Sequence, residues 1–459
     1  MTHIAILGGG PAGYVAAVRA RQLGAEVTLV EMDRLGGVCL NRGCIPSKAL
    51  LRSAEVARLS RELHQYGVEG EFKAVNWPRV MQRKARVVGQ LVKGVESLMQ
   101  QHGVKVVTGR GRMAGGRAIV VDTGGREEIV QADKVVIATG SAPARLPIAG
   151  FEPPLVLTSD EVLELGSIPE SMAIIGGGAI GAEFAEVFSS VGCKVTIIEM
   201  LPRIVPLEDE EVSAELARSF RRRRVEAFTS SRVTEVGERD GARFVRFIRD
   251  GQQQEVTSQV VVSAVGRWPN TGGIGLTEAG VELENRRVKA NARMETSAPG
   301  VYACGDAIGG YLLAHVASAE GKVAVANAVG HPCEMDYTAI PSGIYTHPEI
   351  GSVGLTEAQA QERGVDTKTG RFFYRACGKA IAEGEREGFV KLVVEAATHK
   401  IIGGHIIGPH ATDLIHELVL AIKLGATAEQ VGEMVHAHPT LSEPVMEAAE
   451  DVLGLAIHK

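Results

Sequence analysis

The chain has 459 residues, of which 45% are hydrophobic and 23% charged, and this composition predicts a globular protein of three or four domains. Its formal net charge of -6 is too small to indicate nucleic acid as a partner, and no apolar run is long enough to cross a bilayer, so we expect neither nucleic-acid nor membrane binding. Six cysteines are too few for a disulfide framework, and the first predicted strand begins near residue 4, so we expect a reducing compartment, no signal peptide and a cytoplasmic location.

The first predicted elements are a strand, a glycine-rich turn and a helix. The apolar run at residues 4–7 precedes the turn, and a helical segment extends from it to about residue 23. The three glycines of this G-x-G-x-x-G pattern are Gly8, Gly10 and Gly13. Glycines here allow a tight turn and a close approach of the backbone to a pyrophosphate, and Glu31, which ends the next strand, suits a ribose hydroxyl. The pattern predicts a dinucleotide site, with a tight turn that binds no ligand as the alternative.

Two cysteines, Cys39 and Cys44, follow this unit. A regular helix would separate their Cα atoms by about 7.5 Å, which exceeds the roughly 4.4–6.8 Å that a disulfide tolerates. The pair can therefore bond only if Cys39 lies on a loop or distorted turn and the regular helix begins near Cys44, a start that Gly43 and Pro46 suit. Cys44 would then face the positive end of the helix dipole, which favours the thiolate. The spacing alone also fits two unrelated thiols near the core.

The strand, turn and helix pattern occurs a second time, beginning with the apolar run at residues 172–175. Its three glycines are Gly176, Gly178 and Gly181. The following strand ends in Glu199, whose carboxylate would repel the 2′-phosphate of NADP, so this unit favours NAD. Arg203 is close enough to keep weak use of NADP open. Two complete units predict two dinucleotides, and a turn without a ligand is again the alternative for each.

Two dinucleotide units and a cysteine pair could together pass electrons between a nicotinamide, a flavin and a disulfide. The chain strongly resembles the pyridine nucleotide–disulfide oxidoreductases over essentially its whole length, and within this family the members that act on dihydrolipoamide. The motifs that carry the resemblance lie at residues 36–48, 138–141, 265–270, 303–306, 313–315, 345–349 and 436–443. Their order and spacing together are highly specific.

The resemblance implies an α/β fold with two Rossmann-like dinucleotide-binding domains, for FAD and NAD, and a C-terminal α+β dimerisation domain. The expected segments are a FAD-binding domain with the redox disulfide at 1–147, a NAD-binding domain at 148–266, a central segment that returns to the flavin at 267–337, and the dimerisation domain at 338–459. Further predicted elements are helices within 51–101 and at 412–424, and strands at 389–394 and 401–407.

The resemblance also implies which residues contact the two cofactors. FAD would be held by the first glycine turn, Glu31, Lys48, Gly111, Thr139, Gly140, Ser141, Asp306, Leu312, Leu313, Ala314 and His315. NAD would be held by Gly176, Gly178, Gly181, Glu183, Glu199, Val233 and Gly266. Lys48, one helical turn after Cys44, would approach the flavin and pair with Glu183, and a solvated surface lysine is the alternative. No metal is expected.

A base is required because the thiols of dihydrolipoamide are largely protonated at neutral pH. From its residues alone, the segment around His438 predicts a capped turn or a buried structural histidine. The resemblance instead implies that His438 removes the proton, with Glu443 fixing its tautomer, and that the substrate thiolate attacks Cys39 while Cys44 passes electrons to FAD. In the family the base comes from the neighbouring subunit, which implies a homodimer. The residues predicted to be structural are His436, Cys193, Cys304, Cys333 and Cys377.

The implied partner is a separate lipoyl-bearing protein, either a lipoyl domain of a 2-oxo acid dehydrogenase complex or a glycine-cleavage carrier protein. One alternative is another FAD-dependent disulfide reductase. A glutathione-type enzyme would require arginines after the second nucleotide strand, and a mercuric reductase would require a cysteine pair where residues 455–459 have none. A flavoprotein redox sensor or scaffold is the alternative of a different class. Tyr311 stands where the family often has a proline and could alter the packing beside the flavin.

Overall fold

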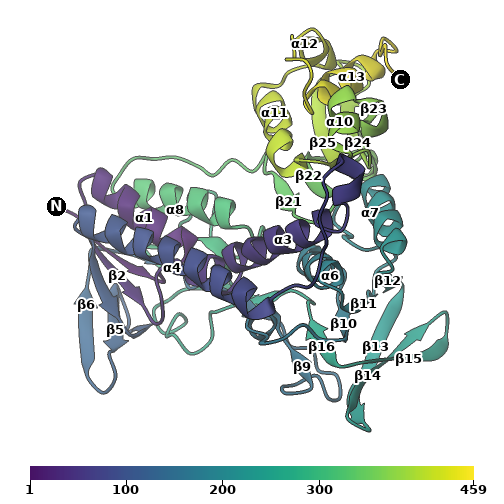
Figure 1. Ribbon diagram of the computed structural model, residues 1–459. Coiled ribbons are helices and arrows are strands. Elements are labelled where there is room, and N and C mark those ends of the chain that lie inside the picture. Colours follow the sequence, from purple (N-terminus) through teal and green to yellow (C-terminus); the bar gives the residue numbers. More distant parts are fainter.

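The computed structural model describes residues 1–459 (Figure 1). Two five-stranded parallel sheets and a C-terminal antiparallel sheet confirm the predicted α/β fold class. The helices α3 (Cys44–Leu59) and α4 (Trp77–Gln101) cross the middle of the molecule between these sheets. None of the helices is both long and apolar enough to cross a membrane.

The first parallel sheet contains the strand of the first glycine turn. Its strands, in spatial order, are β20 (Val301–Ala303), β7 (Lys134–Ile137), β1 (His3–Leu7), β2 (Glu26–Glu31) and β3 (Lys105–Thr108). Residues 4–7 of β1 are buried, as expected for a parallel strand that is covered on both faces. The helices α1 (Pro11–Gln22) and α8 (Ala314–Ala328) pack side by side against this sheet (Figure 1). Through β20 and α8, the predicted central segment 267–337 rejoins the first domain.

Smaller elements complete this first region. They are α2 (Gly37–Arg42), η1 (Leu63–Tyr66), β4 (Arg110–Met113), β5 (Ala118–Asp122), β6 (Glu127–Gln131), β8 (Ser141–Pro143), β17 (Arg267–Pro269), β18 (Leu283–Glu284), β19 (Arg287–Val288) and η2 (Gly305–Ala307). The helices predicted within 51–101 are confirmed as the end of α3, η1 and α4, and residues 67–76 connect η1 to α4 without helix. α4 begins only after Asn76, whose side chain accepts the N–H of Arg79 at 3.1 Å and so satisfies one free donor of the first turn.

The second parallel sheet contains the strand of the second glycine turn. Its strands, in spatial order, are β12 (Glu226–Phe228), β11 (Lys194–Ile198), β10 (Ser171–Ile175), β16 (Val260–Ser263) and β9 (Val156–Leu157). The helices of this region are α5 (Ser159–Val162), α6 (Ala179–Ser190) and α7 (Glu210–Arg222), and an antiparallel sheet of β13 (Ser231–Arg239), β14 (Ala242–Arg249) and β15 (Gln252–Ser258) projects from it (Figure 1). Residues 181–188 of α6 are all buried because the helix packs against both the sheet and α3.

The C-terminal region is an antiparallel sheet covered by short helices. Its strands, in spatial order, are β21 (Ser342–Ile344), β22 (Glu349–Gly354), β25 (Ile401–Gly408), β24 (Phe389–Glu395) and β23 (Thr367–Phe373). Its helices are α9 (Glu357–Glu362), η3 (Tyr374–Ala376), α10 (Gly378–Glu383), α11 (Ala411–Leu424), α12 (Ala428–Gly432) and α13 (Glu443–Val452). The strands predicted at 389–394 and 401–407 and the helix predicted at 412–424 are confirmed.

Candidate active site

The first glycine turn connects β1 to α1 and can be made only by glycine at two positions. Gly8 has φ +110°, and a Cβ atom there would lie 2.2 Å from the carbonyl oxygen of Ala138. At Gly13 a Cβ atom would lie 1.8 Å from the carbonyl oxygen of Gly8. Both distances are far inside van der Waals contact, so a side chain would displace the backbone. At Gly10 the only atom within 4 Å of an added Cβ would be the Cα of Gly37, at 3.8 Å. The turn is therefore open at the N-terminus of α1, where an anionic group is favoured.

The second glycine turn repeats this geometry between β10 and α6. Gly176 has φ +104°, and a Cβ atom there would lie 2.4 Å from the carbonyl oxygen of Ala264. A Cβ atom at Gly181 would lie 2.0 Å from the carbonyl oxygen of Gly176, whereas no atom lies within 4 Å of the position that a Cβ would take at Gly178. The chain therefore builds two glycine turns of equivalent geometry, one in each parallel-sheet domain, and each is open at a helix N-terminus, where an anionic group is favoured.

The acidic residue after each second strand is fixed by backbone N–H groups. Glu31 accepts the N–H of Gly9 at 2.7 Å, and Glu199 accepts the N–H of Gly177 at 2.6 Å. Each carboxylate also accepts the N–H two residues after itself, at 2.8 Å and 2.7 Å respectively. The guanidinium of Arg203 donates to a backbone carbonyl three residues further on, at 3.4 Å. Each carboxylate is therefore held in place beside its glycine turn.

The cysteine pair lies at the junction of two helices. α3 begins at Cys44 as predicted, and Gly43, which has φ -144° and ψ -109°, separates it from α2. The expectation that Cys39 lies on a loop or distorted turn is wrong, because Cys39 lies within α2 and the break at Gly43 supplies the change of direction. Both cysteines are free thiols. A hydrogen bond between the two thiols raises the pKa of Cys39; the same bond, assisted by the charge of Lys48 and opposed by burial, lowers the pKa of Cys44 to about 7.

Lys48, one turn into α3, forms an ion pair that joins the two dinucleotide-binding domains. Its Nζ lies 2.8 Å and 2.9 Å from the two carboxylate oxygens of Glu183 on α6, a side chain that is only 10% exposed. The ammonium also lies 4.2 Å from the ring centroid of Tyr345. These contacts rule out the alternative of a solvated surface lysine and place a fixed positive charge beside Cys44.

Residues 139–141 and Asp306 meet on the first domain. The Ser141 hydroxyl donates to Asp306 Oδ2 at 2.5 Å, and Arg267 Nε donates to the same hydroxyl oxygen at 2.8 Å. Gly140 takes φ +68° between these groups. The hydroxyl of Thr139 is buried and has no hydrogen-bond partner within the protein. A buried hydroxyl normally has a hydrogen-bond partner, so the Thr139 oxygen is available to bond to a bound molecule.

The remaining predicted cofactor contacts lie on strands and turns of the two domains. Gly111 lies on β4, where a Cβ would come 2.4 Å from a side chain of β1. Residues 312–315 lead into α8, which begins at Ala314. Val233 lies on β13, and Gly266, with φ +108°, follows β16. None of these residues shares a hydrogen bond with the cysteine pair or the Lys48 ion pair, so the protein's own contacts do not tie them to the site.

The predicted base, His438, lies between α12 and α13 in the C-terminal domain. Its Nδ1 is 2.8 Å from Oε1 of Glu443, the first residue of α13, and the other oxygen of Glu443 accepts the N–H of Thr440 at 2.8 Å. Burial opposes ionisation of Glu443, but these two bonds hold its pKa below the ordinary value. The imidazole is 77% exposed, and no hydrogen bond or ion pair joins residues 436–443 to the cysteine pair of the same chain. In Figure 1 this end of the C-terminal domain lies far from α1.

The residues predicted to be structural make hydrogen bonds within the protein or are buried. The ring of His436 lies 2.9 Å from a backbone carbonyl and 3.1 Å from Glu417, and its side chain is 3% exposed. Cys193, Cys304 and Cys377 are buried, and Cys333 is exposed, with its backbone N–H and C=O both bonded to the side chain of Asn327.

Comparison with known proteins gives the family. Residues 2–321 match the family described as pyridine nucleotide-disulphide oxidoreductase, and residues 340–449 match the dimerisation domain of that family. The chain belongs to the pyridine nucleotide-disulphide oxidoreductases. The resemblance inferred from the motifs is therefore confirmed, and so is a C-terminal domain of the dimerisation type.

Curated relatives in this family match over the full length. A dihydrolipoyl dehydrogenase of Bacillus subtilis is 44% identical over 99% of this chain and 98% of its own length. One from Geobacillus stearothermophilus is 40% identical over 100% of this chain and 97% of its own. Among solved structures, LpdA of Mycobacterium tuberculosis has a TM-score of 0.91 at 28% identity, covering 98% of this chain and 99% of that chain. The flavoprotein disulfide reductase RclA of Escherichia coli shares the fold, with a TM-score of 0.87 at 24% identity over 98% of this chain and 99% of that chain.

Two residues near the site received no role from the sequence. Arg267 and Tyr345 both lie in motifs that indicated the pyridine nucleotide-disulphide oxidoreductases, but nothing local says what they contact. The signal for Arg267 was a charged residue close behind a buried strand, in a segment predicted to return to the first domain. No local sequence pattern indicates the contacts of Tyr345, because its partners Lys48 and Glu183 lie on two helices that are distant in the sequence.

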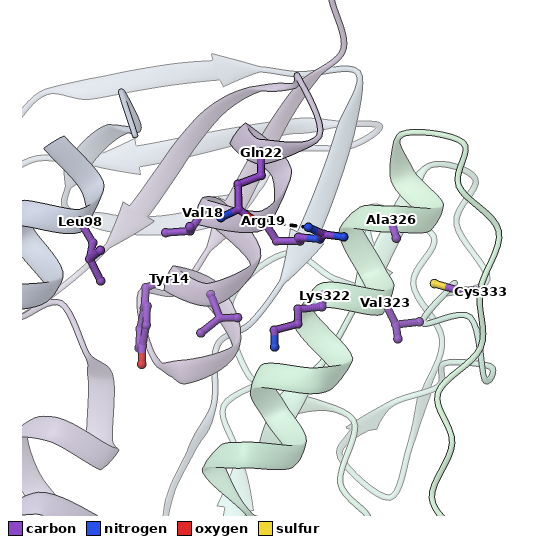
Figure 2. A pocket seen from close by; sticks show the side chains of 10 residues that line it. Tyr14, Val18, Arg19, Gln22, Leu98, Lys322, Val323, Ala326 and Cys333 are labelled. Carbon is purple, nitrogen blue, oxygen red and sulfur yellow. Dashed lines mark hydrogen bonds between the residues drawn. The ribbon is translucent and has the colours of Figure 1, made fainter. Parts of the chain in front are cut away.

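Figure 2 shows a pocket of about 650 Å³ in this pyridine nucleotide-disulphide oxidoreductase, between α1, α4 and α8. Tyr14 and Val18 line it from α1, and Lys322 and Val323 line it from α8. Burial, and to a smaller extent the charge of Cys39, raise the pKa of the Tyr14 phenol. None of the residues that line this pocket was a predicted site residue.

Proposed function

We propose that the chain oxidises dihydrolipoamide to lipoamide with NAD, through a Cys39–Cys44 disulfide and FAD. The observation that carries this proposal is the position of Cys44 at the start of α3, beside a Lys48 ammonium that Glu183 fixes. A thiol held next to a helix N-terminus and a fixed positive charge ionises readily, as thiol–disulfide exchange requires. Full-length relatives that are 40–44% identical and named dihydrolipoyl dehydrogenase support dihydrolipoamide as the substrate.

The residues of the first domain fit a flavin dinucleotide. Gly10 leaves the N-terminus of α1 open for the pyrophosphate, and the fixed carboxylate of Glu31 suits the adenosine ribose. The buried, unpartnered hydroxyl of Thr139 is a polar group that a ligand would satisfy. When bound, FAD would carry two electrons between the cysteine pair and the nicotinamide. The further proposed contacts are Gly8, Gly13, Lys48, Gly111, Gly140, Ser141, Asp306, Leu312, Leu313, Ala314 and His315.

The residues of the second domain fit NAD better than NADP. Glu199 is buried and accepts two backbone N–H bonds, so its charge stays where the 2′-phosphate of NADP would have to bind. Arg203, the cation that kept NADP open, instead donates to a backbone carbonyl. The further proposed contacts are Gly176, Gly178, Gly181, Glu183, Val233 and Gly266.

His438 supplies the proton transfer in this proposal. It takes a proton from one substrate thiol, while Glu443 orients the imidazole and stabilises the imidazolium that forms. The substrate thiolate attacks the sulfur of Cys39 and Cys44 leaves as a thiolate. The second substrate thiol then displaces Cys39, which releases lipoamide and leaves the pair reduced. In total, dihydrolipoamide and NAD⁺ give lipoamide, NADH and a proton.

The base and the cysteine pair would come from different subunits of a homodimer. His438 is exposed, lies in the dimerisation domain and contacts neither cysteine of its own chain. A two-fold dimer would place this surface of one subunit against the other and so form two shared sites. The lipoyl group would arrive on a lipoyl domain of a 2-oxo acid dehydrogenase complex or on a glycine-cleavage carrier protein.

Steady-state rates with lipoyl and glutathione substrates, each with NAD and NADP cofactors, test the proposal. We expect efficient turnover only with dihydrolipoamide and NAD. Rapid reduction of glutathione disulfide by NADPH would instead support a glutathione-type reductase. A flavin-loaded protein that does not turn over dihydrolipoamide would support a redox sensor or scaffold.

A further inference from the structure

The C-terminal domain reaches the Lys48 ion pair within the same chain. The backbone N–H of Tyr345, directly after β21, donates to Glu183 Oε1 at 3.2 Å. The Tyr345 ring lies 4.2 Å from Lys48 Nζ. Two residues later, the N–H of His347 donates to Glu186 at 3.0 Å, one turn further along α6. Residues 345–347 are therefore bound to two carboxylates on neighbouring turns of α6, the helix that follows the second glycine turn.

We infer that Tyr345 is a positioning residue that holds the Lys48 ammonium against Glu183 and near Cys44. The role of the ion pair in this inference rests on the proposed function. Lysine has a long, flexible side chain, so an ion pair with Glu183 alone leaves its ammonium several positions to occupy. The face of an aromatic ring attracts a cation and covers it from water. Tyr345 provides that face from the C-terminal domain, whereas Lys48 and Glu183 belong to the two dinucleotide-binding domains.

The position of Lys48 matters because the groups around Cys44 act in opposite directions. The charge of Lys48 lowers the pKa of Cys44, and the charge of Glu183 raises it. The hydrogen bond with Cys39 also lowers the pKa of Cys44. The Cys44 thiolate further interacts with the charge of Arg267. If the ammonium moved away from Cys44, the carboxylate of Glu183 would remain beside the thiol without its partner. Tyr345 therefore stabilises the thiolate through Lys48, without contacting the sulfur.

A titration of Cys44 in the reduced, full-length enzyme tests this role. The Cβ resonance of 13C-labelled cysteine reports the thiolate, and Cys44→Ser identifies the signal. Tyr345→Leu removes the ring and keeps the backbone N–H, and we expect the thiolate fraction at about pH 6 to fall about three- to tenfold. Tyr345→Phe keeps the ring and should restore the wild-type titration. Tyr66→Leu is the matched control, since Tyr66 is another exposed tyrosine that contacts the C-terminal domain, and it should leave the titration unchanged.

A Lys48→Met background separates positioning from a general structural effect. In that background Tyr345→Leu should change nothing further, because the charge that the ring holds is already gone. An unchanged titration in Tyr345→Leu, or an equal shift with and without Lys48, would overturn the inference. If Tyr345→Leu does not fold, Tyr345→Met takes its place in the titration, because methionine fills the space without a ring. The same fall in the thiolate fraction of Cys44 is expected. The titration requires no substrate, so a wild-type enzyme that fails to oxidise dihydrolipoamide would overturn the proposed function and leave this result interpretable.

Discussion

Lys48 and Glu183 lie 135 residues apart in the sequence, yet the Nζ of Lys48 is 2.8 Å and 2.9 Å from the two carboxylate oxygens of Glu183. The lysine belongs to α3, which begins with Cys44, and the glutamate belongs to α6, which follows the second glycine turn. This ion pair therefore fixes the cysteine pair relative to the second nucleotide-binding domain.

Replacing Glu183 with Gln should lower the free energy of unfolding by about 1–3 kcal/mol, because Lys48 then loses its charged partner at a mostly buried position. Glu282→Gln provides the control, since Glu282 and Lys289 form an exposed pair whose side chains are 63% and 65% accessible. Loss of the exposed Glu282–Lys289 pair should change the free energy of unfolding by less than about 0.5 kcal/mol. Urea unfolding of the holoenzyme measures both variants, and equal effects would contradict the importance of the buried pair.

Gly13→Ala should prevent stable binding of FAD, because its Cβ would lie 1.8 Å from the carbonyl oxygen of Gly8. Gly89 offers a contrasting alanine substitution within α4, where no atom lies within 4 Å of a Cβ. Gly89→Ala should raise stability by about 0.5–1 kcal/mol, the usual gain for alanine over glycine inside a helix. Flavin absorbance and thermal unfolding measure the two outcomes. A wild-type flavin content in Gly13→Ala would show that the turn tolerates a side chain.

The stability of the reduced protein should increase as the pH rises from about 7 to about 9. The thiol–thiol hydrogen bond and the charge of Lys48, opposed by burial, lower the pKa of Cys44 from 9.0 to about 7. A depressed pKa in the folded state stabilises the fold fully above the unfolded pKa, and that contribution is lost as the pH falls through the folded pKa. The gain at about pH 9 relative to about pH 6 should be on the order of 2 kcal/mol. Urea unfolding under reducing conditions measures it, and Cys44→Ser, which lacks the thiol, should not show it.

Mixing Cys39→Ser subunits with His438→Ala subunits should restore activity that neither parent has. A hybrid dimer contains one site with an intact cysteine pair and an intact base, provided that His438 acts across the interface. Random mixing should give about one quarter of the wild-type rate, because half of the dimers are hybrids and each has one active site of two. The rate of NADH formation measures this. A mixture no more active than its parents would place the base and the cysteines in the same chain.

The sequence predicted the local parts of the site and missed the contacts between distant parts. The two glycine turns and the helix start at Cys44 follow from short patterns whose geometry is set by neighbouring residues. The placement of Cys39 within α2 was missed because the break at Gly43 allows helix on both of its sides. The contacts of Tyr345 and Arg267 were also missed, because they depend on how separate domains pack. Tyr311, a departure from the family pattern, stacks on Tyr337 with ring centroids 5.8 Å apart, a contact that no local pattern indicated.

NADH formation from free dihydrolipoamide and NAD, by the wild type and by Cys39→Ser, both loaded with FAD, tests whether electrons pass through the cysteine pair. We predict steady turnover by the wild type. The variant should lose at least about a thousandfold in kcat while it still binds FAD and NAD, because the attacked sulfur is gone. Turnover by Cys39→Ser at a rate near the wild type would contradict an electron path through the cysteine pair.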